Sequence, residues 1–279
     1  MTAQNSRYYQ PMPDLTPRIQ RQYYRNGPPH RGGADVSFAD LLKIFGFNSI
    51  HIGRWVTADE QQLAANLFFD AFCDLQQLLQ VPSEVISLRG SLGLTFGIGG
   101  QPGVCAHYQP QGRILALAKN AGGGSLAHEW YHAFDHYIAE KMFTLHDTRN
   151  QFSSSCWLQH KPLKPHYFNT LLSEVYQKLF LSDSAESESG FFRHCRQLDS
   201  KMNRFYLARP EEMAARAFEK VLQMQPLKNS FLVSGTLKSD AAAHGIYPDD
   251  ALTDILAAIW LQYFSLLGHG LTNKNNSLR

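Results

Sequence analysis

The sequence predicts an α+β fold in which a small mixed sheet packs on helices. Short apolar or alternating segments, separated by glycines and turns, predict strands at 50–55, 85–88, 92–96 and 113–118. Longer segments with helical periodicity lie on both sides of these strands. Because hydrophobic residues make up 44% of the 279 residues and charged residues only 18%, the chain can bury the core that such a fold needs.

Two capping boxes mark helix starts in the N-terminal half. Ser37 with Asp40 predicts a short helix that ends at Gly46, and Thr57 with Glu60 predicts a long helix after it. In each box, a side chain and a backbone N–H satisfy each other across the first turn. These pairs therefore predict where two helices begin.

Further helices are expected along the rest of the chain. Ser125 follows a glycine run and can cap a helix. Other helical segments are predicted at 167–181, 210–224 and 250–267. The polar residues 182–190 predict a solvated loop between the first two of these.

Residues 1–36 form an extension rich in arginine, tyrosine and proline, with no sustained period. Two interpretations stay open for this arm. We favour an arm that lies on its own domain. The alternative is that its interleaved arginines and tyrosines contact nucleic acid or a partner protein.

Composition restricts the partners and the compartment. Lys and Arg outnumber Asp and Glu by 26 to 24, so the net charge of +2 gives no reason to expect a polyanionic partner of the whole molecule. The N-terminus is polar and no run of about eighteen apolar residues occurs, so we expect a cytoplasmic protein with no membrane span. The four cysteines stand singly, which predicts reduced thiols.

The main functional signal is the pentapeptide HEWYH at 128–132, on the helix that follows Ser125. Residues four apart share one helix face, so His128 and His132 can reach one zinc ion, and Glu129 is then placed to act as general base. The predicted strand at 113–118 precedes this helix, where a zincin has the edge strand that pairs with an extended substrate. A buried helix with two hydrogen-bonded histidines is the alternative interpretation.

The third metal ligand is expected from the segment RPEEMAARAFE at 209–219. We choose Glu212, because Ala215 and Phe218 at i+3 and i+6 would let this helix pack closely against the histidine helix. Glu211 is interpreted as a solvated acid that complements the helix dipole, and as an alternative ligand.

Two residues of the histidine helix are weaker candidates for the metal. Asp135 lies seven residues after His128, so it can support a ligand imidazole or bind zinc itself, and we favour the supporting role. His136 cannot converge on the ion with two other ligands of one straight helix, so a structural or substrate-contacting role is expected. Candidate donors to the transition state are Tyr206, Tyr247 and His244.

The segments GSLAHEWYHAFDHYI and YLARPEEMAARAFEKVL together resemble the first of the large polyvalent protein-associated domains, over about 38–267. That family is zincin-like, and its members occur in long proteins of phages and conjugative elements. They also occur as short bacterial proteins with a name borrowed from chloride-channel regulators (CLCA_X), which this chain resembles more. The resemblance implies a metal site at His128 and His132 beside Glu129. One departure from the thermolysin pattern is Arg216, which stands where an aspartate supports a histidine there.

We therefore expect a zincin-like metallohydrolase domain at 37–267, preceded by the extension 1–36 and followed by a flexible tail at 268–279. Its expected function is gluzincin-like zinc metallopeptidase, with one Zn²⁺, a polypeptide substrate, and Glu129 taking the proton of the attacking water. Two alternatives stay open, a catalytically silent zincin fold used for binding or as a scaffold, and an amidase of small molecules.

Overall fold

The computed structural model of the protein describes residues 18–98, 106–119 and 123–277. Its sheet has four strands in the order β1-β2-β4-β3, with β1 and β2, and β2 and β4, parallel and β3 antiparallel to β4. The strands are β1 (Ser49–Ile52), β2 (Gly93–Phe96), β3 (Ala106–Gln109) and β4 (Ile114–Leu117). The predicted α+β class with a small mixed sheet is confirmed.

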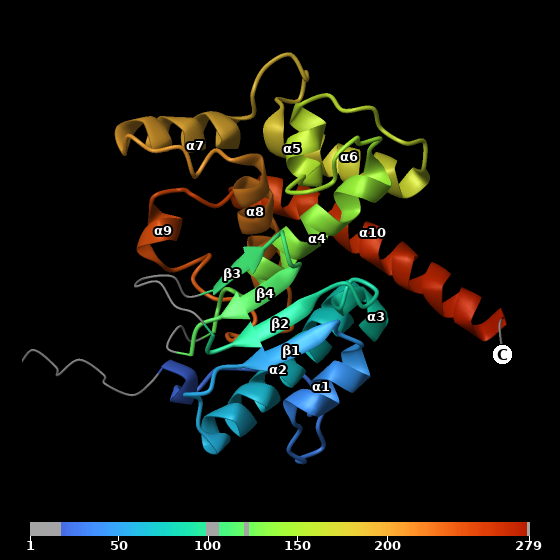
Figure 1. Cartoon of the computed structure of the whole chain (residues 1–279). Helices are drawn as coiled ribbons and strands as arrows, with labels where there is room; N and C mark the ends of the chain where they lie inside the picture. The colour runs from blue at the N-terminus through green and yellow to red at the C-terminus, as the bar shows by residue number, and fades with distance from the viewer. Residues whose placement is uncertain (1–17, 99–105, 120–122, 278–279) are drawn as a thin grey trace, which may run out of the picture.

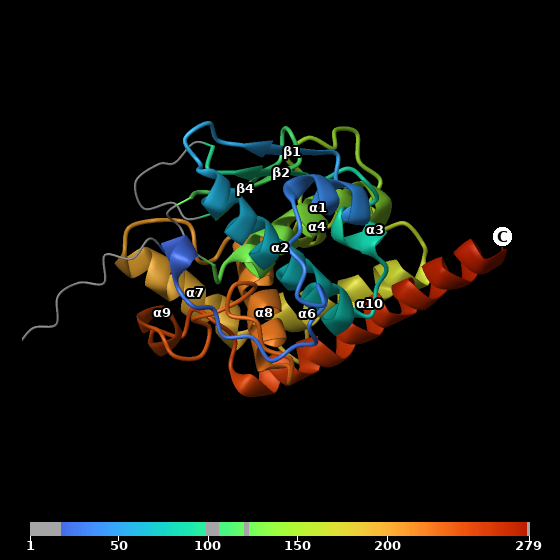
Figure 2. The same cartoon turned by 90° about the horizontal axis from the view of Figure 1, so that it is seen from below.

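Ten α-helices and one short 3-10 helix accompany the sheet within the described residues. The views in Figures 1 and 2 show α1, α2 and α4 under one face of the sheet, with α6, α8 and α10 in a further layer below. The helices are η1 (Arg18–Gln20), α1 (Phe38–Phe45), α2 (Ala58–Leu79), α3 (Ser83–Ile86), α4 (Leu126–Met142), α5 (Ser153–Leu158), α6 (Tyr167–Phe180), α7 (Gly190–Lys201), α8 (Pro210–Met224), α9 (Asp240–Ala243) and α10 (Asp250–Ser277).

Both predicted capping boxes are present. The Ser37 hydroxyl accepts from the Asp40 backbone N–H, and the Thr57 hydroxyl accepts from that of Glu60, while each acid accepts from the backbone of the residue that caps it. Gly46 ends α1 with a φ of 67°, a left-handed conformation in which glycine carries no steric penalty. The first two helices therefore begin where local hydrogen bonding predicts.

Several predicted elements are wrong. Residues 85–88 are not a strand, because Ser83–Ile86 form helix α3. The strand predicted at 113–118 is present as β4, but it is an inner strand, and the sheet edge beside it is the unpredicted strand β3. The tail predicted from residue 268 is helical, because α10 continues to Ser277.

Helices α4 and α8 pack directly against each other in the core. Ala215 is fully buried and lies three residues after Glu212 and three before Phe218, so it adds little bulk to the face of α8 that meets α4. The Phe218 ring lies 4.7 Å from the Tyr131 ring on α4, measured between ring centroids. The predicted close approach of α8 to the histidine helix is confirmed.

The arm lies on the domain over residues 18–36. The Arg25 guanidinium donates to both oxygens of the fully buried Asp74 at 2.6 Å, and His30 Nε2 lies 2.9 Å from the same carboxylate. The favoured interpretation of a wrapping arm agrees with these residues, while residues 1–17 lie outside the described residues. A role of the arm in binding nucleic acid stays a prediction.

Helix α10 departs from the expectation that no segment is long and apolar enough to cross a membrane. Within the described part of the chain, Asp250–Asn273 meets that criterion by length and composition. Its residues Leu256, Trp260 and Phe264 are fully buried against neighbouring helices.

Candidate metal centre

Helix α4 starts at a turn that only glycine can make. A Cβ atom on Gly123 would lie 2.4 Å from the Phe231 ring, and Gly124 has a φ of 106°. The backbone N–H of Ala127 donates to the Leu232 carbonyl at 3.0 Å. The predicted side-chain cap by Ser125 is wrong, because its hydroxyl makes no capping hydrogen bond.

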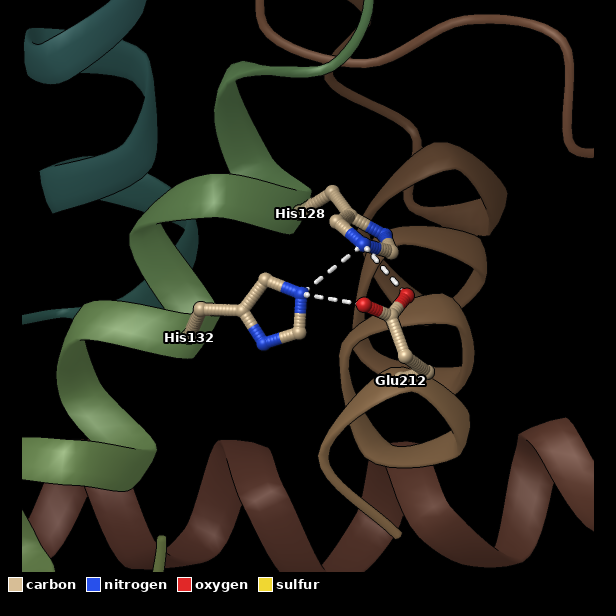
Figure 3. Close-up of side chains that lie close together, drawn as sticks. All are labelled: His128, His132 and Glu212. Atoms are coloured by element: carbon tan, nitrogen blue, oxygen red, sulfur yellow. Dashed lines mark hydrogen bonds and ion pairs between the residues drawn. The ribbon is translucent and has the colours of Figure 1, made fainter. Parts of the chain in front are cut away.

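The structure brings His128, His132 and Glu212 together, from helices α4 and α8 (Figure 3). His128 Nε2 lies 3.0 Å from His132 Nε2 and 3.4 Å from Glu212 Oε2, and His132 Nε2 lies 3.6 Å from Glu212 Oε1. One ligand atom from each residue thus falls within 4.8 Å of the others. Because Glu212 follows His132 by eighty residues, only the tertiary fold brings it to the two histidines.

The spacing of these atoms suits a four-coordinate ion with nitrogen and oxygen ligands. Bonds of about 2.0–2.1 Å to a tetrahedral zinc put neighbouring ligand atoms about 3.4 Å apart, close to the three separations found here. Glu212 Oε2 is buried and has no hydrogen-bond partner among the described residues. Such an orphaned carboxylate oxygen is expected where a cation completes the site.

The electrostatics of the cluster also favour a positive charge. Burial opposes a charge on His128, but the neighbouring carboxylates of Glu219 and Glu212 outweigh it and raise the pKa of His128 to about 10. Burial and the charge on His128 lower the pKa of His132 to about 3. The carboxylates of Glu219 and Glu212 therefore stabilise one positive charge at the pair of imidazoles. A metal ion can supply that charge.

Glu219, which the sequence reasoning did not single out, also lies beside the cluster. Its Oε1 atom lies 3.3 Å from His128 Nδ1, on the side of the ring opposite the Nε2 atom that faces Glu212. A carboxylate on Nδ1 fixes the ring orientation and leaves the Nε2 lone pair available to a metal. The signal was present in the sequence, because Glu219 follows Glu212 by seven residues, two turns along the same face of α8.

Glu129 is buried next to the cluster. Burial raises the pKa of its carboxyl to about 7, although the charge on His128 opposes the shift. The backbone N–H of Tyr108, on strand β3, lies near the Glu129 carboxylate and also opposes the rise of its pKa. Glu129 thus lies between α4 and the sheet edge, a contact that sequence spacing alone does not predict.

Asp135 does not have the predicted supporting role. Its carboxylate accepts from the hydroxyls of Ser153 and Ser154, the backbone N–H of Ser154 and the hydroxyl of Tyr176, at 2.5 to 3.1 Å. These bonds attach α5 and α6 to α4, and they occupy both oxygens. Asp135 is therefore not part of the cluster that holds His128, His132 and Glu212.

Two other candidates for the metal point elsewhere. His136 Nδ1 is 2.7 Å from the Tyr108 hydroxyl, and the residue lines a cavity of about 710 Å³ together with Arg113. Glu211 is not simply solvated, because its carboxylate accepts from the Ser155 hydroxyl at 2.9 Å and pairs with Arg209 at 3.1 Å. The cluster of three ligand atoms includes neither residue.

The three candidate hydrogen-bond donors differ in whether they lie near the candidate metal centre. Burial and the neighbouring Glu212 carboxylate raise the pKa of Tyr206, and burial and the neighbouring Glu219 carboxylate raise the pKa of Tyr247. His244 is exposed and its Nδ1 atom lies 2.5 Å from the Asp240 carbonyl of its own short helix. The structure thus brings both tyrosines to the carboxylates of the centre and leaves His244 away from them.

Comparison with known proteins identifies one part of the chain. Residues 198–271 match the family model described as large polyvalent protein-associated domain 1, which agrees with the resemblance drawn from the sequence. The match includes the segment around Glu212 and Glu219, and it begins after the histidine helix ends. No curated protein and no solved structure matches the chain.

Proposed function

We propose that this protein is a gluzincin-like zinc metallopeptidase with a zincin-like fold. One Zn²⁺ would be held by His128, His132 and Glu212, with Glu129 as general base. The observation that carries the proposal is the convergence of these three ligand groups, with donor atoms 3.0 to 3.6 Å apart, beside a buried glutamate. This arrangement leaves a fourth position open to water, as in catalytic rather than structural zinc sites.

The donor set favours zinc over the alkaline-earth ions. Calcium and magnesium take six or more ligands, almost all of them oxygens, whereas two imidazoles and one carboxylate suit zinc and its neighbours in the first transition row. When bound, such an ion supplies Lewis acidity that polarises a carbonyl and lowers the pKa of a water molecule toward neutrality.

Glu129 would handle the proton. Its pKa, raised by burial to about 7, lets the carboxylate accept a proton from the attacking water and release it to the leaving amine. The backbone N–H of Tyr108 on strand β3 favours the charged form of this carboxylate beside the cluster. Peptide hydrolysis then needs no further proton carrier, since the proton taken from water ends on the new amino group.

Strand β3 supports a polypeptide as substrate. It is the edge of the sheet, it runs antiparallel to β4, and it packs beside α4. The outer edge of such a strand can hydrogen-bond with an extended peptide backbone. This role replaces the one predicted for residues 113–118, which form an inner strand.

Tyr206 is the better placed of the candidate donors to a developing oxyanion. Tyr206 is 42% exposed, so it borders open space, and burial together with the nearby Glu212 carboxylate raises the pKa of its hydroxyl. A donor at this position would stabilise negative charge on the scissile carbonyl oxygen. Tyr247 instead lies beside Glu219, which is not one of the three candidate ligands.

The proposal is tested by metal content, measured by elemental mass spectrometry on chelator-free protein. We expect about one zinc per chain in the wild type and its loss in His132→Ala and Glu212→Ala. His244→Ala is the matched control, because this histidine is exposed and lies outside the cluster. A wild-type protein that takes up no zinc after reconstitution would exclude a zinc enzyme and leave a binding or scaffold protein.

A further inference from the structure

Tyr247 stands between two backbone carbonyls that are held by buried cations of α8. Arg216 Nε donates to the Ile246 carbonyl at 2.9 Å, and Lys220 Nζ donates to the Pro248 carbonyl at 2.7 Å. Arg216 is 3% exposed and Lys220 is 6% exposed. Ile246 and Pro248, on either side of Tyr247, are therefore each held to α8 by a different charged group.

Buried cations are an expensive way to attach a loop. Removing a guanidinium or an ammonium group from water costs several kcal/mol, and apolar side chains of similar size often pack helices as well or better. Charged hydrogen bonds do, however, fix the direction and position of a carbonyl more narrowly than apolar contact. A need for exact placement of the Tyr247 segment beside the candidate metal centre would explain why charged groups hold it.

Tyr247 connects this segment to the candidate metal ligands. Burial and the neighbouring Glu219 carboxylate raise the pKa of Tyr247, and Glu219 Oε1 lies 3.3 Å from His128 Nδ1. The chain Tyr247–Glu219–His128 thus leads from the clamped loop to a ligand imidazole. Arg216 adds a second attachment, because its Nη2 atom donates to the carbonyl of Leu207, next to Tyr206.

We propose that Arg216 and Lys220 are positioning residues for the metal centre, which hold Tyr247 so that its hydroxyl fixes Glu219 against His128. The proposal rests on the function proposed above. It assigns to two buried cations and one tyrosine a role in metal affinity, although none of the three contacts the ion.

The physical consequence concerns the orientation of one ring. A carboxylate that accepts from Nδ1–H keeps His128 in the tautomer whose Nε2 lone pair points at the ion. A hydrogen bond from the Tyr247 hydroxyl to that carboxylate would restrict its rotation. Loss of such an outer hydrogen bond typically weakens metal binding by about 10–100-fold.

The relay is tested by zinc affinity of the full-length protein, measured by competition with a chromophoric chelator. We expect Tyr247→Phe to weaken zinc binding by about 10-fold, and Glu219→Gln by about 10–100-fold. In the double variant, the Tyr247 change should add less than about twofold, since it acts only through Glu219. Full additivity, or an unchanged affinity in Tyr247→Phe, would overturn the proposal.

The clamp is tested with Lys220→Met against Lys228→Met. Both lysines donate to a backbone carbonyl, but Lys228 donates to Gln223, away from the Tyr247 segment. We expect a severalfold loss of zinc affinity in Lys220→Met only, rescued by Lys220→Arg and absent when Tyr247 is already phenylalanine. A purely structural clamp would lower the melting temperature of Lys220→Met and leave its zinc affinity at the wild-type value.

These outcomes separate the two proposals. Wild-type protein that binds no zinc overturns the proposed function and this inference with it. Wild-type protein that binds zinc, with Tyr247→Phe and Lys220→Met unchanged in affinity, overturns this inference alone.

Discussion

Glu129 and Glu212, which both lie beside the histidines, differ in their affinity for a proton. Burial raises the pKa of Glu129 to about 7. Burial also opposes a charge on Glu212, but the two histidines and the Tyr206 hydroxyl outweigh it and lower the pKa of Glu212 to about 2. At neutral pH, one carboxylate is therefore suited to exchange a proton and the other to hold a cation, a division of roles that acid–base catalysis requires.

This difference predicts the behaviour of Glu129→Gln. The amide keeps the size of the side chain but cannot accept a proton, so we expect near-normal zinc content and a hydrolysis rate lowered by about 10²–10⁴-fold. The assay is cleavage of an unfolded protein substrate, with metal content measured on the same sample. Unchanged cleavage by the zinc-loaded variant would contradict the role of Glu129.

Sequence patterns predicted only those parts of the site that depend on residue spacing within one helix. His128 and His132 follow from the i, i+4 geometry of a helix, and Glu212 was chosen from small residues on its own helix face. The contact between Glu129 and the Tyr108 backbone depends on how the sheet edge meets α4, which no local pattern encodes. For the same reason, Asp135 was predicted to support an imidazole although it attaches α5 and α6 instead.

At the scale of elements, the start of α8 depends on one carboxylate of α7. Asp199 accepts from the backbone N–H groups of Tyr206, Leu207 and Ala208 at 2.8 to 2.9 Å. Burial opposes ionisation of Asp199, but these three donors outweigh it and hold its pKa below the ordinary value of 3.8. The bonds fix the short segment that leads into the helix carrying Glu212.

The lowered pKa fixes the sign of a pH dependence. The stability that Asp199 contributes is fully present above pH 3.8 and is lost as the pH falls through the lower pKa of the folded state. We expect Asp199→Asn to be less stable than the wild type at pH 6, with a difference that narrows below pH 4. Urea unfolding at both pH values measures it, and a constant difference would contradict the assignment.

Close packing between α4 and α8 predicts the effect of a larger side chain. Ala215 is fully buried where the helices meet, so Ala215→Leu should destabilise the protein by about 1–3 kcal/mol. It should also weaken zinc binding, because α8 carries Glu212. Ala251→Leu, at an exposed position of α10, is the control for thermal unfolding and zinc content. Equal stabilities of the two variants would contradict the packing argument.

Elements were predicted well where they were long or had defined ends, and poorly where they were short. The capping boxes gave the starts of α1 and α2, and Pro210 with two acids gave that of α8. Val85 and Ile86 were assigned to a strand, because a short apolar run does not distinguish a strand from a buried helical turn. Strand β3 was missed, since its four residues are only partly buried and its pairing with β4 is a tertiary contact.

At the scale of the whole molecule, the arm connects distant parts of the chain. Asp74 on α2 accepts from Arg25 of the arm and from the Asn229 side chain amide at 2.8 Å. The Tyr23 hydroxyl accepts from the backbone N–H of Gly123, in the turn before α4. The arm thus contacts the turn that precedes the histidine helix α4. Through Asp74 it is also linked to the loop that contains Asn229.

Arg25→Ala should therefore affect the entire fold. The change leaves Asp74 buried without its bidentate partner, so we expect a loss of about 3 kcal/mol in the free energy of unfolding. Arg149→Ala removes a pair at an exposed site and should leave the free energy of unfolding nearly unchanged. Urea denaturation of both variants measures the difference, and similar losses would show that the arm is dispensable.

The docking of the arm also has a consequence for the order of events during synthesis. The Asn26 side chain donates to the carbonyl of Pro226, a residue that lies 200 positions later in the chain. At about 5–20 residues per second, a ribosome would need roughly 10 to 40 seconds to deliver that partner. The arm is thus made well before its partner and is among the last segments to find its place. During that interval it is open to proteases and chaperones, and the turn before the histidine helix lacks its tyrosine contact until the arm arrives.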